Sequence, residues 1–422
     1  MVSATTMRTT RHSRTRALRV ALPACFLMLQ AATGCRAAVE SSKASRVDLG
    51  AVEAIASPAT GSATSQQLTT SGDRVILSWL DLATDRATLT FAERTTSGWS
   101  DARAVPAATD LVANAADVPS VRALADGTLV AHWLQEDGPD PESYRLPLSW
   151  SKDGGKTWSP PATPHHDGTQ TQHGFGTSFQ APGGGLGIVW LDGRATAAGA
   201  PSGGGDIGLW SATFDRDAKQ TSETAVVPRT CECCQTSVAE TSDGAVVAFR
   251  GRAADEIRDV FVTRLVDGRW TPPAAVHNDG WKIDGCPING PAVTARGRDV
   301  AVAWFTAPTG EGQAFVAFSH DAGRTFDNPV RIDEGSGTGH VDAELLADGA
   351  VAVSWTEFVN KQSQVRLRRV DATGSLSPAL TIGVTMAMQY PRLAQGRDEL
   401  LVTWIKSEDL RVGTARVPLK RQ

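Results

Sequence analysis

The sequence lacks the features of several protein classes. It has no excess of basic residues, because 41 Lys and Arg stand against 46 Asp and Glu, giving a formal net charge of -5. A broad basic surface for nucleic acid is therefore excluded. No long stretch carries apolar residues at helical spacing, whereas glycine (40), proline (22) and tryptophan (12) are plentiful. This composition predicts an all-β fold of many short strands joined by turns.

The N-terminus carries an export pattern. Residues 1–34 contain arginines but no Lys, Asp or Glu, and they include a short apolar run from Val20 to Leu29. The run is too short to span a bilayer, so the pattern predicts a secretory signal peptide over residues 1–34. The segment Ala32-Thr-Gly-Cys35 resembles a bacterial lipoprotein signal, in which the cysteine is lipidated and becomes the new N-terminus. The alternative is ordinary cleavage nearby, with Cys35 unmodified.

The lipoprotein resemblance also bears on location. Arg36 follows Cys35, where an aspartate retains some bacterial lipoproteins at the inner membrane. We therefore expect the protein to be exported and lipid-anchored in the cell envelope, at the outer membrane or the periplasmic face. The lipid anchor is then its only membrane contact. Residues 35–45 are predicted to form a tether, and residues 46–422 a single domain.

An internal repeat organises that domain. An apolar strand ending in tryptophan or, once, in Phe-Arg recurs about every fifty residues, which is a spacing typical of repeat architectures. The seven copies are Val75–Trp79, Leu129–Trp133, Leu186–Trp190, Val246–Arg250, Val300–Trp304, Val351–Trp355 and Leu401–Trp404.

The size of the repeat predicts its fold. A short strand precedes most copies and a second hairpin follows, so each unit holds about four antiparallel strands. Radial repetition of such units makes a β-propeller, here of seven blades with six as the alternative. The last unit lacks a fourth strand, and the segment Ala51–Ile55 is placed to supply it and close the ring without an exposed edge.

Two hairpins carry a more specific motif. Residues 151–158 (SKDGGKTW) and 319–326 (SHDAGRTF) both read Ser-x-Asp-x-Gly-x-Thr-aromatic. In such a turn the Asp carboxylate accepts turn amides and the aromatic ring packs between sheets. The motif resembles the Asp-box, or bacterial neuraminidase repeat, of the sialidase superfamily. In that family the Asp-boxes lie on the face away from the catalytic pocket, so they indicate the fold and leave the function open.

Polar residues at the starts of the innermost strands indicate where a site would lie. In a propeller these starts converge on the mouth of the central channel, and arginines there could hold a carboxylate or another anion. The alternative is that the arginines pair with Asp255, Glu256 and Asp259 and join neighbouring blades. The predicted ligand-binding residues are Arg194, Arg250, Arg252, Arg258, Asn289, His340, Asp342 and Arg392.

The sialidase resemblance implies a catalytic candidate. Sialidases join an arginine triad for the substrate carboxylate to a tyrosine nucleophile, and Tyr390 opens the last repeat at a similar position, close to Arg392. The Phe-Arg-Ile-Pro motif that carries the first triad arginine in that family is absent from this chain. No acidic residue can be assigned as the acid/base. Tyr390 is therefore the single catalytic candidate of an alternative function, an exo-acting glycosidase.

Four cysteines lie near the fourth and fifth repeats. They are Cys231, Cys233, Cys234 and Cys286, and adjacent blades bring the two segments together. In an exported protein disulfides are the default. One bridge is expected to join Cys286 to one of the other three cysteines, although three pairings are open. The alternative is a thiolate site for Cu or Zn, since four cysteines can supply all the ligands that such ions need.

These patterns together predict a binding protein of the cell envelope. The expected ligand is a glycan, an anionic small molecule or an envelope protein, bound by a monomer at the central funnel. No cofactor is expected unless Cu or Zn occupies the cysteines. The two alternatives are the glycosidase that uses Tyr390 and a metal-handling propeller.

Overall fold

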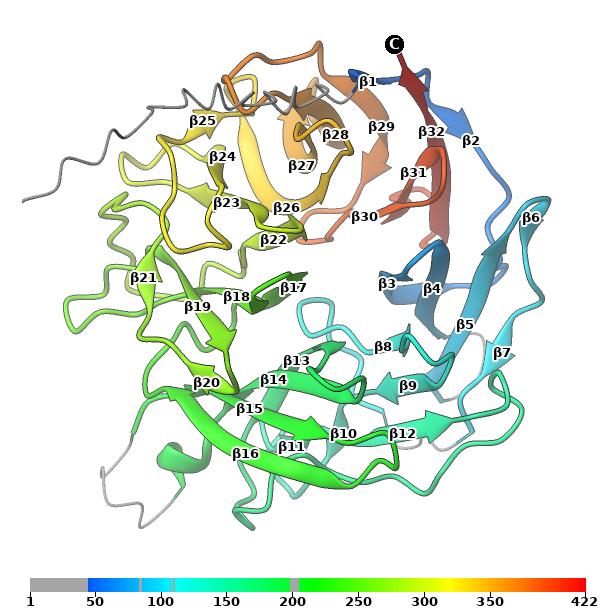
Figure 1. Cartoon of the computed structure of the whole chain (residues 1–422), viewed down its shortest axis with the longest axis vertical. Coiled ribbons are helices and arrows are strands. Elements are labelled where there is room, and N and C mark those ends of the chain that lie inside the picture. The colour runs from blue at the N-terminus through cyan, green and yellow to red at the C-terminus, as the bar shows by residue number, and fades with distance from the viewer. Residues whose placement is uncertain (1–44, 83–85, 107, 109–110, 198–204) are drawn as a thin grey trace, which may run out of the picture. The chain divides into compact units, whose positions relative to one another are not determined.

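The computed structural model describes residues 45–422 except 83–85, 107, 109–110 and 198–204. The predicted signal peptide and Cys35 lie outside the described residues. The described chain forms seven antiparallel sheets arranged radially around a central axis (Figure 1). The seven-bladed propeller is therefore confirmed, and the six-bladed alternative is wrong.

The innermost strand of each sheet lies beside the central axis. These strands alternate in side-chain direction, so every second residue faces the axis. In chain order they are β3 (Ala63–Ser71), β8 (Ser120–Ala123), β13 (His173–Gln180), β17 (Ser237–Thr241), β22 (Ala292–Arg296), β26 (Gly337–Leu345) and β30 (Arg392–Gln395).

The second strands are the repeated apolar runs that the sequence shows. Each lies inside its own sheet, and that sheet packs between two neighbouring sheets. The second strand is therefore buried on both faces, which explains why its residues are apolar without alternation. They are β4 (Arg74–Asp81), β9 (Leu129–His132), β14 (Leu186–Asp192), β18 (Gly244–Arg250), β23 (Asp299–Thr306), β27 (Val351–Val359) and β31 (Glu399–Ile405).

The third and outer strands complete the sheets and face the rim of the ring. The third strands are β5 (Thr88–Thr95), β12 (Leu148–Ser151), β15 (Gly208–Phe214), β19 (Val260–Val266), β24 (Gln313–Ser319), β28 (Gln362–Val370) and β32 (Val412–Arg421). The outer strands are β6 (Gly98–Trp99), β7 (Arg103–Ala104), β16 (Gln220–Val227), β20 (Arg269–Trp270), β21 (Ala274–Ala275), β25 (Val330–Arg331) and β29 (Leu380–Thr385). The second sheet adds a hairpin of β10 (Gln135–Glu136) and β11 (Tyr144–Arg145), and one 3-10 turn, η1, spans Arg194–Thr196.

The hydrophobic core lies between the sheets. Each pair of neighbouring sheets shares one cluster of buried apolar side chains, built around the repeated aromatic residues. The first and last sheets share one as well, in which Leu77 and Trp79 pack with Ala394 and Leu401. Because this contact joins the two ends of the repeat array, the ring is closed.

The N-terminal segment completes the last sheet. Two short strands, β1 (Val47–Leu49) and β2 (Glu53–Ala54), both pair antiparallel with β32. The closing strand predicted over 51–55 is thus confirmed at β2, and β1 extends the pairing towards the N-terminus. The long edge of β32 is covered as a result, which removes a site for pairing with other chains.

The two Asp-box turns have the hydrogen bonds that their motif predicts. The Oδ1 atom of Asp321 accepts the backbone N–H groups of Arg324 (3.0 Å) and Thr325 (2.9 Å), and its Oδ2 accepts the Thr325 hydroxyl. Although partial burial opposes it, this donor set lowers the pKa of Asp321 to about 2. Both turns follow a third strand, so they lie at the end of the ring opposite to the starts of the innermost strands.

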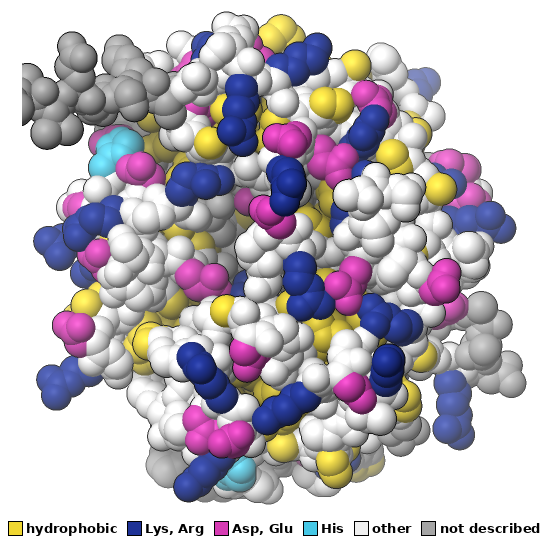
Figure 2. Space-filling model, turned by 45° about the vertical axis from the view of Figure 1, so that its right-hand side comes forward, with side chains coloured by type: hydrophobic (Ala, Val, Ile, Leu, Met, Phe, Trp, Pro, Cys, Tyr) yellow, Lys and Arg dark blue, Asp and Glu magenta, His cyan; other side chains and the backbone are white. Residues whose placement is uncertain are grey.

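The surface carries charges of both signs. Figure 2 shows basic and acidic side chains interspersed over the visible face, with apolar side chains only in small areas. In the described part of the chain, no helix is long and apolar enough to cross a bilayer. An anion-binding site on the face seen in Figure 2 would therefore come from individual groups rather than from a broad basic surface.

Candidate functional site

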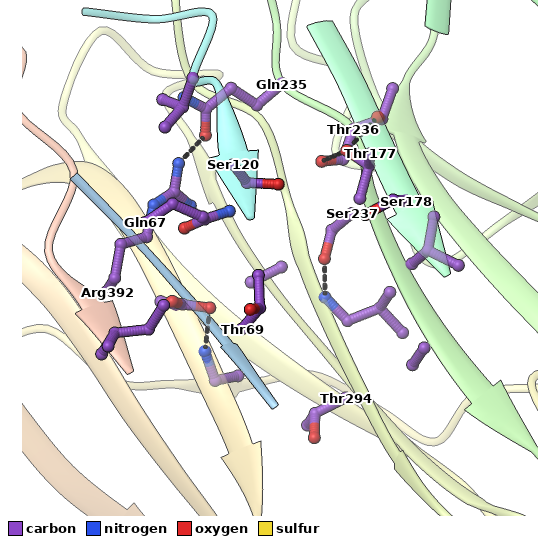
Figure 3. A pocket seen from close by; sticks show the side chains of 18 of the residues that line it. Gln67, Thr69, Ser120, Thr177, Ser178, Gln235, Thr236, Ser237, Thr294 and Arg392 are labelled. Atoms are coloured by element: carbon purple, nitrogen blue, oxygen red, sulfur yellow. Dashed lines mark hydrogen bonds between the residues drawn. The ribbon is translucent and has the colours of Figure 1, made fainter. Parts of the chain in front are cut away.

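A polar channel runs along the axis of the ring (Figure 3). Its volume is about 240 Å³, and all seven innermost strands contribute polar side chains to its wall. One such residue from each strand gives the set Thr69, Ser120, Thr177, Ser237, Thr294, Asp342 and Arg392. Sequence reasoning identified Asp342 and Arg392 but missed the hydroxyl groups. A sequence signal for these hydroxyl groups exists, because polar residues alternate within the innermost strands, as in Gln67, Thr69 and Ser71.

Some of these hydroxyl groups join neighbouring sheets. The Thr69 hydroxyl donates to the carbonyl of Val121 (2.7 Å), and the hydroxyl oxygen of Ser237 accepts the N–H of Val293 (3.0 Å). Thr294 likewise accepts the N–H of the Leu345 backbone (3.0 Å). A hydroxyl group has one donor hydrogen besides its acceptor lone pairs. In the described contacts Ser237 and Thr294 only accept, so each retains a donor hydrogen at the channel wall.

Arg392 is the arginine of the channel wall that comes from the innermost strand β30, and Asp342 is the carboxyl group that acts on its charge. Its side chain is nine-tenths buried in the channel wall and donates from Nη2 to the amide oxygen of Gln235 (2.7 Å). Its Nε has no hydrogen-bond partner, and no carboxylate of the described residues forms an ion pair with it. A buried guanidinium with an unused N–H group and no direct ion pair can still donate to an anion in the adjacent space.

Two carboxyl groups share the channel with Arg392. Burial raises the pKa of Asp342, against the opposing effect of Arg392 and of two backbone N–H donors. Burial also raises the pKa of Glu344, to about 8, with a further contribution from Asp342. Glu344 is only partly exposed, and it faces a narrow channel that screens charge poorly. Its carboxyl group is thus protonated at neutral pH and does not repel an anion.

The raised pKa of Glu344 predicts a pH dependence of stability. Its folded pKa of about 8 exceeds the ordinary value of 4.5, so the folded state keeps a proton that the unfolded state releases. Stability therefore falls as the pH rises from 4.5 through 8, by up to about 1.4 kcal/mol per pH unit. Glu344→Gln should remove this loss and unfold at a higher temperature than the wild type at pH 9, but not at pH 4. Parallel melting profiles of the two proteins, with exposed Glu142→Gln as the control, would contradict the assignment.

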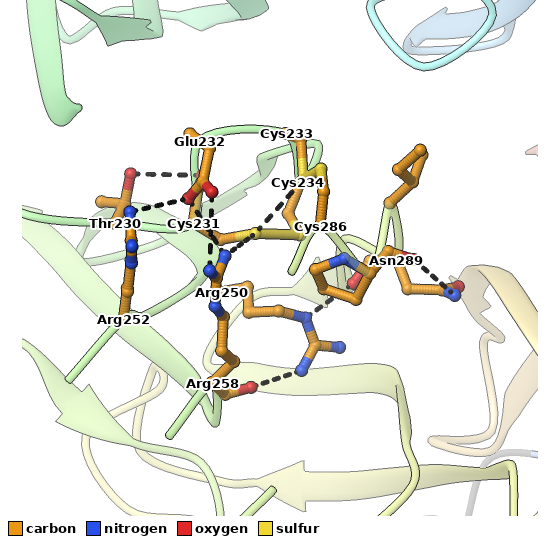
Figure 4. Close-up of a disulfide and its surroundings, with 12 residues drawn as sticks. Thr230, Cys231, Glu232, Cys233, Cys234, Arg250, Arg252, Arg258, Cys286 and Asn289 are labelled. Atoms are coloured by element: carbon orange, nitrogen blue, oxygen red, sulfur yellow. Dashed lines mark hydrogen bonds and ion pairs between the residues drawn. A yellow bond between two sulfur atoms is a disulfide. The ribbon is translucent and has the colours of Figure 1, made fainter. Parts of the chain in front are cut away.

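Arg250 lies at the mouth of the channel but faces the protein interior. It is 1% exposed, and its guanidinium donates to the carbonyls of Asn289 (2.8 Å), Arg258 (2.5 Å) and Phe305 (2.6 Å) (Figure 4). Burial lowers its pKa to about 10, so it is charged at neutral pH. Backbone carbonyl groups of three different segments thus stabilise the buried charge of Arg250.

Arg252 and Arg258 belong to an ion-pair network beside Arg250 (Figure 4). Arg258 lies 3.0 Å from both Glu232 and Glu256, and Arg252 lies 2.9 Å from Glu256. Of the acidic partners that the alternative reading named, only Glu256 takes part. Asp259 accepts backbone N–H groups of a neighbouring loop instead. The network joins the loop of the cysteines to the loop after β18.

Arg194 lies in a separate buried network. It contacts Asp192 (2.8 Å), Glu223 (2.7 Å) and Asp167 (3.4 Å), and its guanidinium stacks on the ring of Trp210. Asp167 also accepts from His173 (3.0 Å), whose ring stacks on that of His165. Sequence reasoning missed the two histidines and Asp167 as partners of Arg194. Since Arg194 already occupies the position between the carboxylates, the cluster is satisfied internally.

Tyr390 is buried rather than exposed to the channel. It is 3% exposed, and its hydroxyl donates to the carbonyl of Ile288 (2.6 Å). Burial raises the pKa of Tyr390, so the phenol stays protonated. Tyr390 and Arg250 contact adjacent carbonyls, of Ile288 and Asn289, and so lie at the same end of the ring as expected. A protonated phenol bonded to the backbone does not favour a role as nucleophile.

The last two predicted ligand residues lie together near Tyr390. Asn289 accepts the backbone N–H of His340 through its Oδ1 (2.8 Å), and the His340 ring packs edge-on against Tyr390. Both line a second cavity that is distinct from the channel. The structure thus divides the predicted site, since Asp342 and Arg392 line the channel whereas Asn289 and His340 line its neighbour.

The four cysteines form two disulfides (Figure 4). Cys231 pairs with Cys234, and Cys233 pairs with Cys286. The predicted bridge from Cys286 to one of the other three cysteines is confirmed. It ties the segment before the fourth sheet to the segment before the fifth. All four sulfur atoms are oxidised in this form. The Cu or Zn alternative would therefore require the reduced protein.

Known proteins resemble this chain in repeat pattern and in fold. Residues 87–402 match the family described as BNR repeat-like domain, whereas no curated protein matches the sequence. The polysaccharide lyase Uly1 is 10% identical, with a TM-score of 0.52 over 89% of this chain and 99% of that chain. An ulvan lyase of family PL25 bound to -[GlcA(1-4)Rha3S]- is 10% identical, with a TM-score of 0.51 over 89% and 94%. The sialidase NanB from Streptococcus pneumoniae is 9% identical, with a TM-score of 0.44 over 89% and 94%.

Proposed function

The chain belongs to the family of BNR repeat-like domains, and from that premise we propose that it binds an anionic glycan at the central channel. The observation that carries the proposal is Arg392, which is buried in the channel wall without an ion pair. The free O–H donors of Ser237 and Thr294 support the same preference. A carboxylate or sulfate of a sugar is an acceptor for donors of these kinds.

The other predicted arginines do not compete for this role. Arg194, Arg252 and Arg258 already pair with carboxylates, and Arg250 donates to carbonyls. The structural neighbours show the fold alone, so they contribute only a class of probe. The ulvan lyase was solved with a glycan that contains GlcA, an acidic sugar. Acidic oligosaccharides are therefore the ligands to test first.

We also propose that the protein acts outside the cytoplasm, anchored through Cys35. The support is the N-terminal pattern together with the two disulfides, which form and persist in oxidising compartments. A lipid-anchored propeller would present its channel to soluble or surface glycans of the envelope.

The binding test uses glycan pairs that differ in one acidic group. After a glycan array has selected acidic ligands, calorimetry compares each with its neutral counterpart, for example sialyllactose with lactose and a glucuronate disaccharide with the matching glucoside. We expect binding of the acidic member only, and Arg392→Gln should weaken it by at least about tenfold. Arg252→Gln is the matched control and should bind as the wild type does, because its guanidinium already pairs with Glu256.

Two outcomes would overturn this proposal. One is that no acidic glycan on the array binds more tightly than its neutral counterpart. The other is that Arg252→Gln abolishes binding whereas Arg392→Gln retains it, which would place the ligand on the ion-pair network at the mouth instead of in the channel.

A further inference from the structure

The second cavity near the mouth has an unusual lining. It measures about 330 Å³ and shares no residue with the channel. Met386 and Met388 both line it, and they are the only methionines after residue 28. Both are exposed, at 40% and 52%, although methionine is ordinarily a core residue. The segment thus presents two thioether groups to one space at the protein surface.

His340 lines the same cavity and has a free ring nitrogen. Its Nδ1 lies 3.2 Å from the Thr356 hydroxyl, which donates its own hydrogen to the carbonyl of Gly339 (2.9 Å). The oxygen of Thr356 must therefore accept from Nδ1–H of His340. The proton of the neutral ring is fixed on Nδ1, and Nε2 keeps its lone pair. This Nε2 is buried and has no hydrogen-bond partner.

The hydrogen bond at Nδ1 is one that metal-binding histidines commonly have. A histidine ligand usually donates its other ring N–H to a protein acceptor, which fixes the tautomer and the orientation of the ring.

The backbone of the lining is held in an uncommon conformation. Ile288, His340 and Met388 have φ angles of 45°, 52° and 63°, in the left-handed region that residues other than glycine rarely adopt. Such conformations persist only where the surrounding structure enforces them, and they gather at functional sites. Here they occur in three of the segments that meet at one cavity.

We propose that Met386, Met388 and His340 form a binding site for a soft monovalent metal ion, Cu(I). Thioether sulfur selects Cu(I) and imidazole nitrogen also binds copper, whereas Mg²⁺ and Ca²⁺ require oxygen donors. The described residues that line the cavity include no carboxylate, so the site offers neutral ligands to a single positive charge. Cys286 also lines the cavity, but its sulfur is in a disulfide and is not among the ligands.

Silver(I) is the probe that tests this site without a reductant. It shares the ligand preference of Cu(I) and leaves the disulfides intact, and a thiol assay first verifies that the four cysteines of the folded domain are oxidised. Titration of the full chain, labelled with ¹³C at the methionine methyl groups, should show one tightly bound Ag(I) and shifts of the Met386 and Met388 signals. Calorimetry on the same protein supplies the affinity.

Three variants locate the ligands. The double variant Met386→Leu, Met388→Leu should lose on the order of 100-fold in affinity, and His340→Gln at least about tenfold. The control His320→Gln changes an exposed histidine outside the cavity and should bind as the wild type does. The two methionines are exposed, so their replacement should leave the fold intact. The double methionine variant therefore tests the site even if His340→Gln does not fold.

The proposal is overturned if the oxidised protein binds no Ag(I) at micromolar concentrations, if the double methionine variant binds as the wild type does, or if a folded His340→Gln keeps full affinity. These outcomes are independent of glycan binding, because the variants leave Arg392 and the channel unchanged.

Discussion

Replacing Arg250 by methionine should lower the free energy of unfolding by about 3 to 5 kcal/mol. The guanidinium donates to the carbonyls of Asn289, Arg258 and Phe305 in a site that is 99% shielded from solvent. Methionine fills much of the volume but donates nothing, so buried carbonyl groups lose their partner. Each such loss costs about 1 to 3 kcal/mol. Urea unfolding at pH 7 measures the effect.

Two further variants show whether Arg250 acts through these bonds. Arg250→Lys keeps the charge but lacks the planar fork with which arginine reaches three separate carbonyls. The stability of this variant should therefore lie between those of the wild type and Arg250→Met. Arg252→Met removes a partly exposed arginine from the adjacent ion-pair network and should cost no more than about 1 kcal/mol. If Arg250→Met were fully stable but failed to bind acidic glycans, Arg250 would be a ligand contact and not a structural residue.

Arg250 also shows how far sequence reasoning extends. An arginine at a position where six other repeats have tryptophan needs a partner or a ligand, and that requirement follows from sequence alone. The identity of the partner does not. The carbonyls come from residues 258, 289 and 305, and only the folded ring brings their backbones to one point.

The fold was predictable because of where its strands lie. The second strand of a sheet that packs between two other sheets is buried on both faces. The seven apolar runs can therefore be recognised in the single sequence, without an alignment. The closing strand at Glu53–Ala54 was predictable from the missing fourth strand of the last unit. By contrast, β1 consists of three residues, Val47–Leu49, with a polar residue at its centre, and such a segment carries no periodic signal.

The candidate site was predictable as a region but not as a set of contacts. The innermost strand starts do converge, yet the arginines there differ in environment. Glu232, which no spacing rule singled out, pairs with Arg258, whereas Asp255 forms none of the predicted pairs in the described contacts. Charges within one loop can pair in several ways, and backbone geometry selects among them. Arg392 stands out only once the partners of the other arginines are known.

The two disulfides should differ in their contribution to stability. Cys233–Cys286 joins residues 53 positions apart, whereas Cys231–Cys234 joins residues 3 positions apart. A disulfide stabilises chiefly by restricting the unfolded chain, and this effect grows with the length of the loop that it closes. The expected contributions are about 4 kcal/mol for the long loop and about 2 kcal/mol for the short one.

Two alanine double variants isolate each disulfide. Cys231→Ala with Cys234→Ala leaves only the long-range bridge, and Cys233→Ala with Cys286→Ala leaves only the local one. For each variant, urea unfolding is compared before and after reduction with dithiothreitol, so the two states have the same sequence and the same buried side chains. The oxidised and reduced forms should differ about twice as much in the variant that keeps Cys233–Cys286. An equal or smaller difference in that variant would mean that the reduced unfolded chain keeps the segments before the fourth and fifth sheets together. It would then follow that the contacts of Arg258 and Arg250, and not the disulfide, hold these two segments in place.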